Sequence, residues 1–267
     1  MKKLPIYQVD AFADSVFKGN PAAIVPLKEE WLTDELMQKI AAENNLAETA
    51  YIIQRDGSYD IRWFTPAVEV DLCGHATLAS AHIVLNMFHV KAKQVKFNSL
   101  RSGTLTVTKD KDQLVLDFPT DTLSPTDLPE ALVQGLNAVP VETYKGKTDY
   151  MLVFENQEQI ERLRPNFNWI AKVEARGIIV TAPGREKDID FVSRFFAPQS
   201  GINEDPVTGS AHTTLVPYWS EKLGKKDLVG HQISDRGGVL YCQHKGARVK
   251  LGGKTALYLK GEIMLED

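Results

Sequence analysis

The stretch "VDLCGHATLASAHIV", Val70 to Val84, places a cysteine, a glycine and a histidine ahead of a run of alanines and branched apolar residues. A later stretch, "INEDPVTGSAHTTLVPYW" from Ile202 to Trp219, has a similar order of glycine, polar residue and alanine. The chain therefore carries two versions of one kind of segment, and the fold prediction rests on this pair.

The surroundings of the two segments match as well. Arg62 in "RWFTPAVEVDLCGHATLASAH" precedes Gly74 by 12 residues, and Arg194 in "SRFFAPQSGINEDPVTGSAHTTL" precedes Gly209 by 15 residues. An insertion of three residues aligns them, which favours an internal duplication. Chance similarity between two strand-then-helix units is the alternative at this point.

The segment that begins at Gly74 has apolar residues on nearly every side of a helical wheel, which is typical of a helix buried all round. Strand-like runs rich in Val, Ile, Thr, Tyr and Phe alternate with helical runs along the chain. We therefore predict an α+β fold of two similar halves. Each half is expected to be a curved, barrel-like mixed sheet wrapped around a central buried helix.

The length of 267 residues allows one large domain or two smaller ones. The pattern of strands breaks at "PTDTLSPTDLPE", which is rich in Pro, Thr and Asp and indicates a domain crossing. The predicted halves are residues 1–118 and 119–267, and a return of the last strand to the first half stays open.

The overall charge and the cysteine count exclude several classes of partner and cofactor. A formal net charge of -4 and a pI near 5.9 argue against nucleic acid or an anionic membrane as the main partner. Two cysteines are too few for a disulfide framework and predict a reduced, cytoplasmic setting. Nucleotide-binding and zinc-protease motifs are absent, so we expect no cofactor and no metal. His75, His82 and His89 recur every seven residues, about 10 Å apart on a helix, which is too far for one metal ion.

Gly74 and Gly209 each stand at the expected start of a helix. The first backbone N–H groups of a helix lack partners within it, and a small residue there lets an anion approach. Two facing helix starts could hold one carboxylate between them. The alternative is that both glycines only relieve backbone crowding at tight turns.

Two carboxylates are candidates for proton chemistry. Glu48, in "NNLAETAYI", stands among apolar residues, where burial would raise its pKa toward the range useful to a general acid or base. A cap or surface glutamate is the simpler reading. Asp205 precedes Pro206, which favours an extended backbone and brings the Asp205 carboxylate close to the following helix start. Its simpler role is to cap that helix, and both roles are compatible.

Several motifs, taken together and in order, resemble the PhzF-like family of phenazine-biosynthesis proteins. They are "YQVDAF", "GNPAAIV", "NNLAETAYI", "RWFTPAVEVDLCGHATLASA" and "EDPVTGSA", which span most of the chain. The resemblance implies a diaminopimelate-epimerase-like fold with the active site in the cleft between its halves. It also implies a cofactor-free isomerase, commonly a homodimer, that moves a proton on a small carboxylic acid.

The resemblance also implies roles for individual residues. Glu48 of "AET" matches the family's catalytic acid/base, and His75 of "CGHAT" and Asp205 of "EDP" match its assisting polar residues. The positions that match the lining of the substrate cleft are Asn20 of "GNP", Gly74, Gly209 and Ser210.

The chain departs from the pattern of related epimerases in two places. Those enzymes use two opposed cysteines, whereas here Cys73 matches the first and Thr208 stands at the second. The segment 235–251 differs from the Gly-Arg-rich closing pattern expected of the family. We therefore predict an isomerase with Glu48 as proton shuttle. The alternatives are an epimerase or racemase that depends on Cys73, or a non-catalytic protein that binds a small carboxylate; membership of a phenazine pathway stays open.

Overall fold

The computed structural model describes residues 2–266 and divides the chain into two compact units. The first unit runs to Asp117 and takes up the chain again from Gly252 to the C-terminal end, so the last strand belongs to it. The second unit consists of Phe118–Leu251. Both units mix α-helices with β-strands, in agreement with the predicted α+β class.

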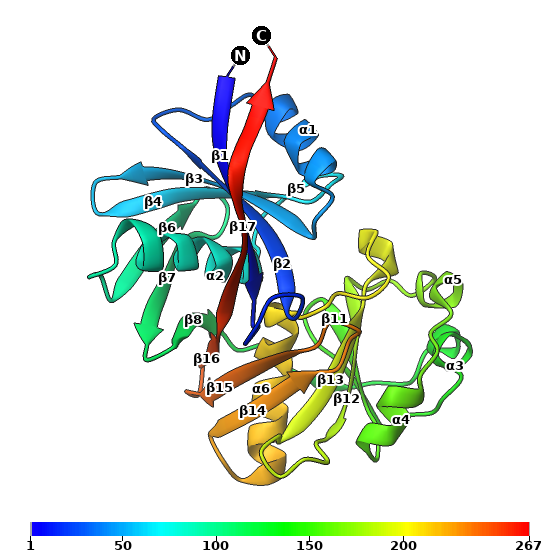
Figure 1. Cartoon of the computed structure of the whole chain (residues 1–267). Coiled ribbons are helices and arrows are strands. Elements are labelled where there is room, and N and C mark those ends of the chain that lie inside the picture. The colour runs from blue at the N-terminus through cyan, green and yellow to red at the C-terminus, as the bar shows by residue number, and fades with distance from the viewer. Residues whose placement is uncertain (1, 267) are drawn as a thin grey trace. The chain divides into compact units, whose positions relative to one another are not determined.

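The first unit is built on one curved sheet. Its strands are β1 (Lys2–Ala11), β2 (Asn20–Leu27), β3 (Glu48–Arg55), β4 (Ser58–Phe64), β5 (Glu69–Val70), β6 (Gln94–Ser99), β7 (Gly103–Asp110), β8 (Gln113–Pro119) and β17 (Thr255–Leu265). β1 lies antiparallel between β17 and β2, so the first and last strands of the chain are neighbours (Figure 1). β2 pairs with β3 in parallel and β3 with β4 antiparallel. β4 then pairs with β6 in parallel, and β6–β7 and β7–β8 are antiparallel.

The helix predicted from the first quoted segment is α2 (Gly74–Ile83), which continues into a π-helical turn at Val84–Phe88. It contacts β1, β2, β3, β7 and β17, so strands surround it on several sides. Its apolar side chains are removed from solvent all round, as the sequence predicted: Ala76, Leu78, Ala79, Ala81 and Ile83 are all fully buried. A helix with no polar face can be stable only in such a position.

A second helix of the first unit, α1 (Asp34–Asn44), sets the start of β3. Thr33 caps its N-terminus, and the Thr33 hydroxyl accepts a hydrogen bond from the Leu36 N–H at 3.3 Å; Asn45 caps its C-terminus in a left-handed conformation with φ 47°. The hydroxyl of Tyr51 on β3 donates to the Met37 carbonyl at 2.7 Å, which ties the helix to the sheet. The turn after Asn45 then delivers the chain to β3.

The second unit contains the remaining elements. Its strands are β9 (Ser124–Pro125), β10 (Glu142–Lys145), β11 (Asp149–Val153), β12 (Gly177–Pro183), β13 (Phe191–Phe196), β14 (Asp227–Gln232), β15 (Gly238–His244) and most of β16 (Arg248–Gly253). Its helices are α3 (Glu130–Leu136), α4 (Gln157–Arg162), α5 (Phe167–Ile170), the 3-10 turn Pro198–Ser200 and α6 (Gly209–Leu223). A core that includes Leu132, Phe154, Ile178 and Phe196 packs between α3–α5 and the strands.

The two units repeat one order of strand pairing. In the first, β1–β2 is antiparallel, β2–β3 parallel, β3–β4 antiparallel, β4–β6 parallel and β6–β7 antiparallel. In the second, the pairs β10–β11, β11–β12, β12–β13, β13–β14 and β14–β15 follow the same alternation. The buried helix occupies the same place in each series, with α2 before β6 and α6 before β14. Chance similarity of two short segments does not account for this, and we conclude that the halves are duplicated.

A pair of matching ion pairs precedes the two helices. Arg62 on β4 donates from Nε and Nη2 to both oxygens of Glu69, at 2.7 and 2.8 Å. Arg194 on β13 makes the same two bonds to Glu204, also at 2.7 and 2.8 Å. Each glutamate stands five residues before the first residue of its helix. These bidentate pairs fix the chain where it enters α2 and α6, because two parallel hydrogen bonds hold both planar groups in one orientation.

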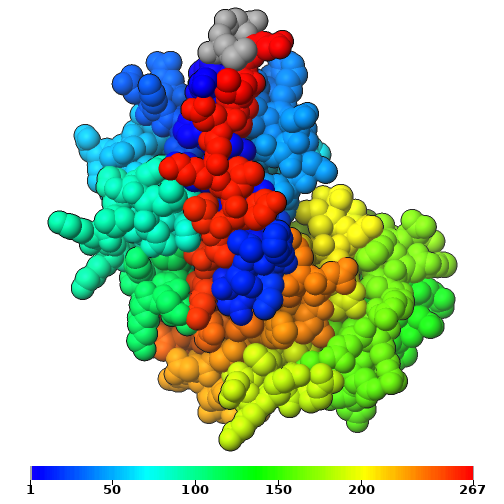
Figure 2. All heavy atoms as spheres, in the orientation of Figure 1, coloured from blue at the N-terminus to red at the C-terminus, as the bar shows by residue number. Residues whose placement is uncertain are grey.

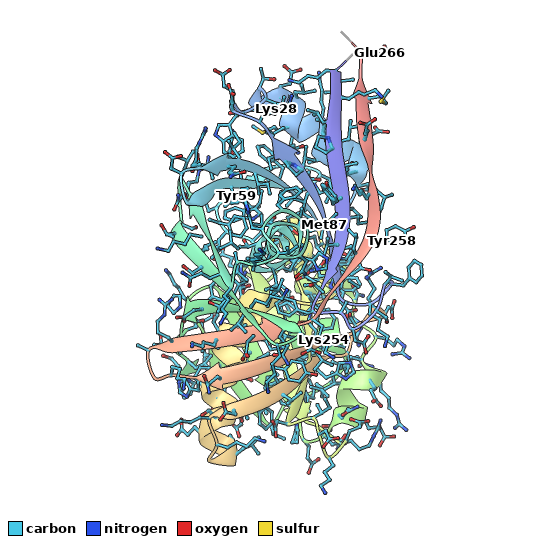
Figure 3. All side chains as sticks on the ribbon, turned by 60° about the vertical axis from the view of Figure 1, so that its left-hand side comes forward. Lys28, Tyr59, Met87, Lys254, Tyr258 and Glu266 are labelled. Atoms are coloured by element: carbon cyan, nitrogen blue, oxygen red, sulfur yellow. The ribbon has the colours of Figure 1, made fainter. Side chains whose placement is uncertain are left out.

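Strand β17 forms part of the surface of the first unit, beside the segment that follows β1 (Figure 2). The ring of Tyr258 is about half exposed and projects from the strand (Figure 3), and it meets Phe17 edge-on with ring centroids 5.5 Å apart.

None of the helices within residues 2–266 combines the length and the apolar character that crossing a membrane requires.

His212 on α6 gives the second unit a pH-dependent stability. It is fully buried, its Nδ1 lies 2.9 Å from the Thr208 carbonyl, and its Nε2 has no hydrogen-bond partner among residues 2–266. Burial lowers the pKa of His212 from 6.5 to about 4, although the bond to Thr208 opposes this in part. Between these two values the unfolded chain binds a proton that the folded chain does not, so stability falls as the pH falls.

We expect acidification from pH 6.5 to 4 to remove about 3 kcal/mol of unfolding free energy through His212 alone. Urea unfolding of the wild type and of His212→Gln, at pH 7 and at pH 4.5, measures this contribution. The difference in unfolding free energy between wild type and His212→Gln should become smaller, or change sign, at pH 4.5. Curves that stay equally far apart at both pH values would show that His212 does not titrate in this window.

Candidate active site

Glu48 is the first residue of β3 and pairs with Ala22 across the parallel β2–β3 ladder. The fold places it where the chain leaves the turn after α1 and enters the sheet. Its side chain is 13% exposed, and Oε2 lies 3.0 Å from Nε2 of His75. Asn20, which begins β2, lies two residues before Ala22 and is fully buried, so it stands at the same end of the sheet.

His75 is the second residue of α2, and its ring is buried between two partners. Nε2 faces Glu48, while Nδ1 lies 3.6 Å from the thiol sulfur of Cys73. Cys73 is the residue immediately before the helix, and its carbonyl accepts the Thr77 hydroxyl at 2.6 Å. Glu48, His75 and Cys73 therefore form a short chain of three groups, drawn from one strand and one helix start of the first unit.

The protonation states of Cys73 and His75 follow from burial and from the charges of neighbouring groups. Burial raises the pKa of Cys73 to about 11, with the Glu48 charge adding to the effect, so Cys73 is a neutral thiol at pH 7. Burial alone would lower the pKa of His75, but its neighbours Cys73 and Glu48 outweigh burial and raise that pKa well above its ordinary value. Cys73 is the larger of these two influences on the His75 pKa and Glu48 the smaller, and both favour the protonated ring.

Both helix starts were predicted correctly, because α2 begins at Gly74 and α6 begins at Gly209. The residues before them, Cys73 and Thr208, form no side-chain cap in the described part of the chain. The Thr208 hydroxyl donates instead to Asp205, at 2.5 Å. The side chains of Cys73 and Thr208 therefore leave the N–H groups of each first turn uncapped, and the helix dipole favours a negatively charged group at both positions.

Asp205 lies in the loop before α6, where several bonds fix its position. Its N–H donates to the Phe195 carbonyl at 3.0 Å, and its own carbonyl accepts from Nε2 of Gln232 at 2.7 Å. Oε1 of Gln232 in turn accepts the Thr208 N–H at 2.8 Å. The backbone of Asp205 is thus held by β13 and β14, and its carboxylate accepts the Thr208 hydroxyl at the helix start.

Ser210, the second residue of α6, contacts an arginine. Its hydroxyl oxygen accepts a hydrogen bond from Nη1 of Arg176 at 2.7 Å. Arg176 is held in turn by two hydrogen bonds to the buried carboxylate of Asp149, of which the Nε bond measures 2.9 Å. Because the Ser210 oxygen accepts from Arg176, its hydroxyl hydrogen can donate to another group.

The structure groups the predicted residues within each unit. Glu48 and His75 touch in the first, and Asp205 and the start of α6 are joined through Thr208 in the second. The residues that sequence reasoning missed are Arg176, Asp149, Gln232 and the two Arg–Glu pairs. The spacing of Glu69 and Glu204 before the helix glycines was a readable signal for the pairs. Arg176 and Gln232 lie 34 and 24 residues from their partners, with no local pattern to reveal them.

The chain also matches known proteins over almost its whole length. The family model described as phenazine biosynthesis-like protein, PhzC-PhzF, matches residues 9–261. An uncharacterized isomerase of Pseudomonas aeruginosa is 48% identical over 263 residues, which cover 98% of this chain and 100% of the relative. The crystal structure of a PhzF-family protein from Enterococcus faecalis is 44% identical and superposes with a TM-score of 0.94, covering 99% of this chain and 100% of the other.

More distant structures share the fold alone. A hydroxyproline epimerase from Agrobacterium vitis matches with a TM-score of 0.62 at 10% identity, covering 99% of this chain and 93% of the other. The epimerase-like fold predicted from the sequence is therefore confirmed. Taken with the matches above, the chain belongs to the PhzC-PhzF family of phenazine biosynthesis-like proteins, and it is an isomerase.

Proposed function

We propose that this isomerase moves a proton between two carbons of a small carboxylic acid, with Glu48 as the group that removes and returns it. The observation that carries the proposal is the approach of Glu48 to His75, 3.0 Å apart in a mostly buried position. A proton shuttle must act first as a base and then as an acid. The Glu48 carboxylate can accept the proton, and the neighbouring His75 imidazole can stabilise the negative charge of Glu48 when the proton has left it.

The reaction proceeds in two proton transfers. The Glu48 carboxylate takes a proton from a carbon next to the substrate's unsaturated or carboxyl group, and the electron pair of that C–H bond spreads into this group. The protonated Glu48 then gives the proton to a different carbon, and the carboxylate is restored. Protons and electrons balance within substrate and enzyme. The charge that develops between the two steps is of the kind that helix-start N–H groups and His75 can stabilise.

An epimerase that depends on Cys73 is the second candidate, and the contact between Cys73 and His75 favours it. A thiol must lose its proton to act as a base, and the raised pKa of Cys73 works against that. A Cys73→Ser protein with unchanged turnover would exclude this candidate. A purely binding role would appear as tight binding of a carboxylic acid without any exchange of its hydrogens.

The test is a panel of small unsaturated, α-amino and hydroxy acids incubated with the protein in heavy water. We expect at least one acid to gain deuterium at carbon, or to change the position of its double bond. NMR identifies the labelled carbon and thereby the substrate class. The same acids incubated with heat-denatured protein supply the background rate.

A further inference from the structure

The side chains of Cys73, His75 and Glu48 carry donor atoms of the kinds that Zn²⁺ prefers. A thiol sulfur, an imidazole nitrogen and a carboxylate oxygen, from Cys73, His75 and Glu48, all lie within 4.8 Å of one another. Within residues 2–266 this is the one group of three or more such side chains that meets this distance. Three protein ligands with a fourth position left for water are the usual arrangement of an open zinc site.

We propose that Glu48, Cys73 and His75 bind Zn²⁺ or a similar thiophilic divalent ion, and that this ion inhibits the isomerase. The inhibitory part rests on the proposed function, because an ion held by Glu48 would occupy the group that carries the proton. Binding itself rests only on the side chains of the first unit. The ion is therefore an inhibitor that competes with catalysis.

The spacing of the sulfur and the nitrogen fits a tetrahedral ion. Zn–S and Zn–N bonds of about 2.3 and 2.0 Å, at a tetrahedral angle, place the two ligand atoms about 3.5 Å apart. The Cys73 sulfur and Nδ1 of His75 lie 3.6 Å apart. Glu48 faces the other ring nitrogen, so its carboxylate must move by roughly an ångström or more to reach the same ion. A glutamate side chain can make this movement by rotating its bonds.

Two buried atoms of the group lack a well-directed hydrogen bond. Oε2 of Glu48 and Nε2 of His75 lie 3.0 Å apart, yet neither has a properly aligned partner among the described residues. Buried polar atoms in native proteins are usually satisfied, and exceptions often mark a site for a water molecule, an ion or a ligand. Coordination of Glu48 to a metal ion would satisfy the carboxylate.

The backbone at Cys73 is already fixed. The Thr77 hydroxyl and the Thr77 N–H both donate to the Cys73 carbonyl, at 2.6 and 3.2 Å. The sulfur and the imidazole therefore need little rearrangement to bind an ion, and a preformed pair of ligands lowers the free-energy cost of binding.

Titration with Co²⁺ tests binding without any substrate, because a cobalt–thiolate bond gives a near-ultraviolet charge-transfer band. We expect wild type to show this band with one ion bound per chain, and Zn²⁺ to displace it. Cys73→Ser should lose the band, while Glu48→Gln should weaken binding by more than about 10- to 100-fold, the loss typical of removing even an outer-shell partner. The matched control is Cys242→Ser, which removes the other buried cysteine and should keep the band.

A wild-type protein that binds Co²⁺ without the thiolate band, or does not bind it, would overturn the proposal whether or not the variants fold. So would a band that survives in Cys73→Ser and disappears in Cys242→Ser. In the exchange assay, Zn²⁺ should abolish deuterium uptake and EDTA should restore it. A thiolate band from a protein without exchange activity would support the metal site and contradict the proposed function, so the two failures are distinguishable.

Discussion

Glu48→Gln is expected to lower turnover by about 10²–10⁴-fold with little change in substrate binding. Glutamine keeps the shape of the side chain and most of its hydrogen bonding near His75, but it cannot take up and release a proton. Steady-state kinetics on the acid identified by deuterium exchange measures kcat, and equilibrium binding of the same acid separates affinity from chemistry. Glu43→Gln is the matched control, since Glu43 is exposed on α1 and should tolerate the same change.

The outcome that contradicts this role is a Glu48→Gln enzyme with near-normal kcat. A large rise in the dissociation constant with kcat unchanged would assign Glu48 to binding and not to proton transfer. In either case Asp205 is the next residue to test, because it is the other carboxylate singled out for proton chemistry.

The second large effect concerns the bidentate ion pair at the entrance to α2. Replacing Arg62 with methionine leaves the Glu69 carboxylate, which is 21% exposed, without its main partner. Breaking a buried pair in this way costs about 3–5 kcal/mol, and the partial exposure of Glu69 favours the lower end of that range. Urea unfolding of wild type and Arg62→Met should show this loss in the unfolding free energy.

The double variant Arg62→Met/Glu69→Leu supplies the control for this experiment. Replacing both charges by apolar groups of similar volume is often nearly neutral, so the double variant should recover much of the loss. A single variant as stable as wild type would mean that the pair contributes little to the fold. Equal loss in the single and double variants would attribute the effect to packing and not to an unpaired charge.

Features that depend on a local pattern were predictable from the sequence. The apolar run after Gly74 can be stable only as a buried helix, and the structure places α2 there with its apolar side chains buried. Thr33 followed by acidic residues signals a helix start, and α1 begins there. The paired glycine segments predicted a duplication, which the repeated strand pairings bear out.

Contacts between residues far apart in the chain were not predictable in the same way. Glu48 stands among apolar residues in the sequence, which left a buried acid/base and a cap or surface glutamate both open. Its actual partner, His75, lies 27 residues later and meets it only because β3 and the start of α2 come together in the folded unit. The family resemblance named both residues, but a single sequence holds no signal for the distance between them or for the proton on His75.

Deuterium uptake from heavy water tests the proton-shuttle role of Glu48 most directly. Wild type and Glu48→Gln are incubated with the same acid in heavy water, and the deuterium at each carbon of substrate and product is followed by NMR. We expect wild type to introduce deuterium at the carbons between which the proton moves, and Glu48→Gln to introduce almost none while still binding the acid. Equal uptake by the two proteins would contradict the role of Glu48 and place the proton transfer on another group.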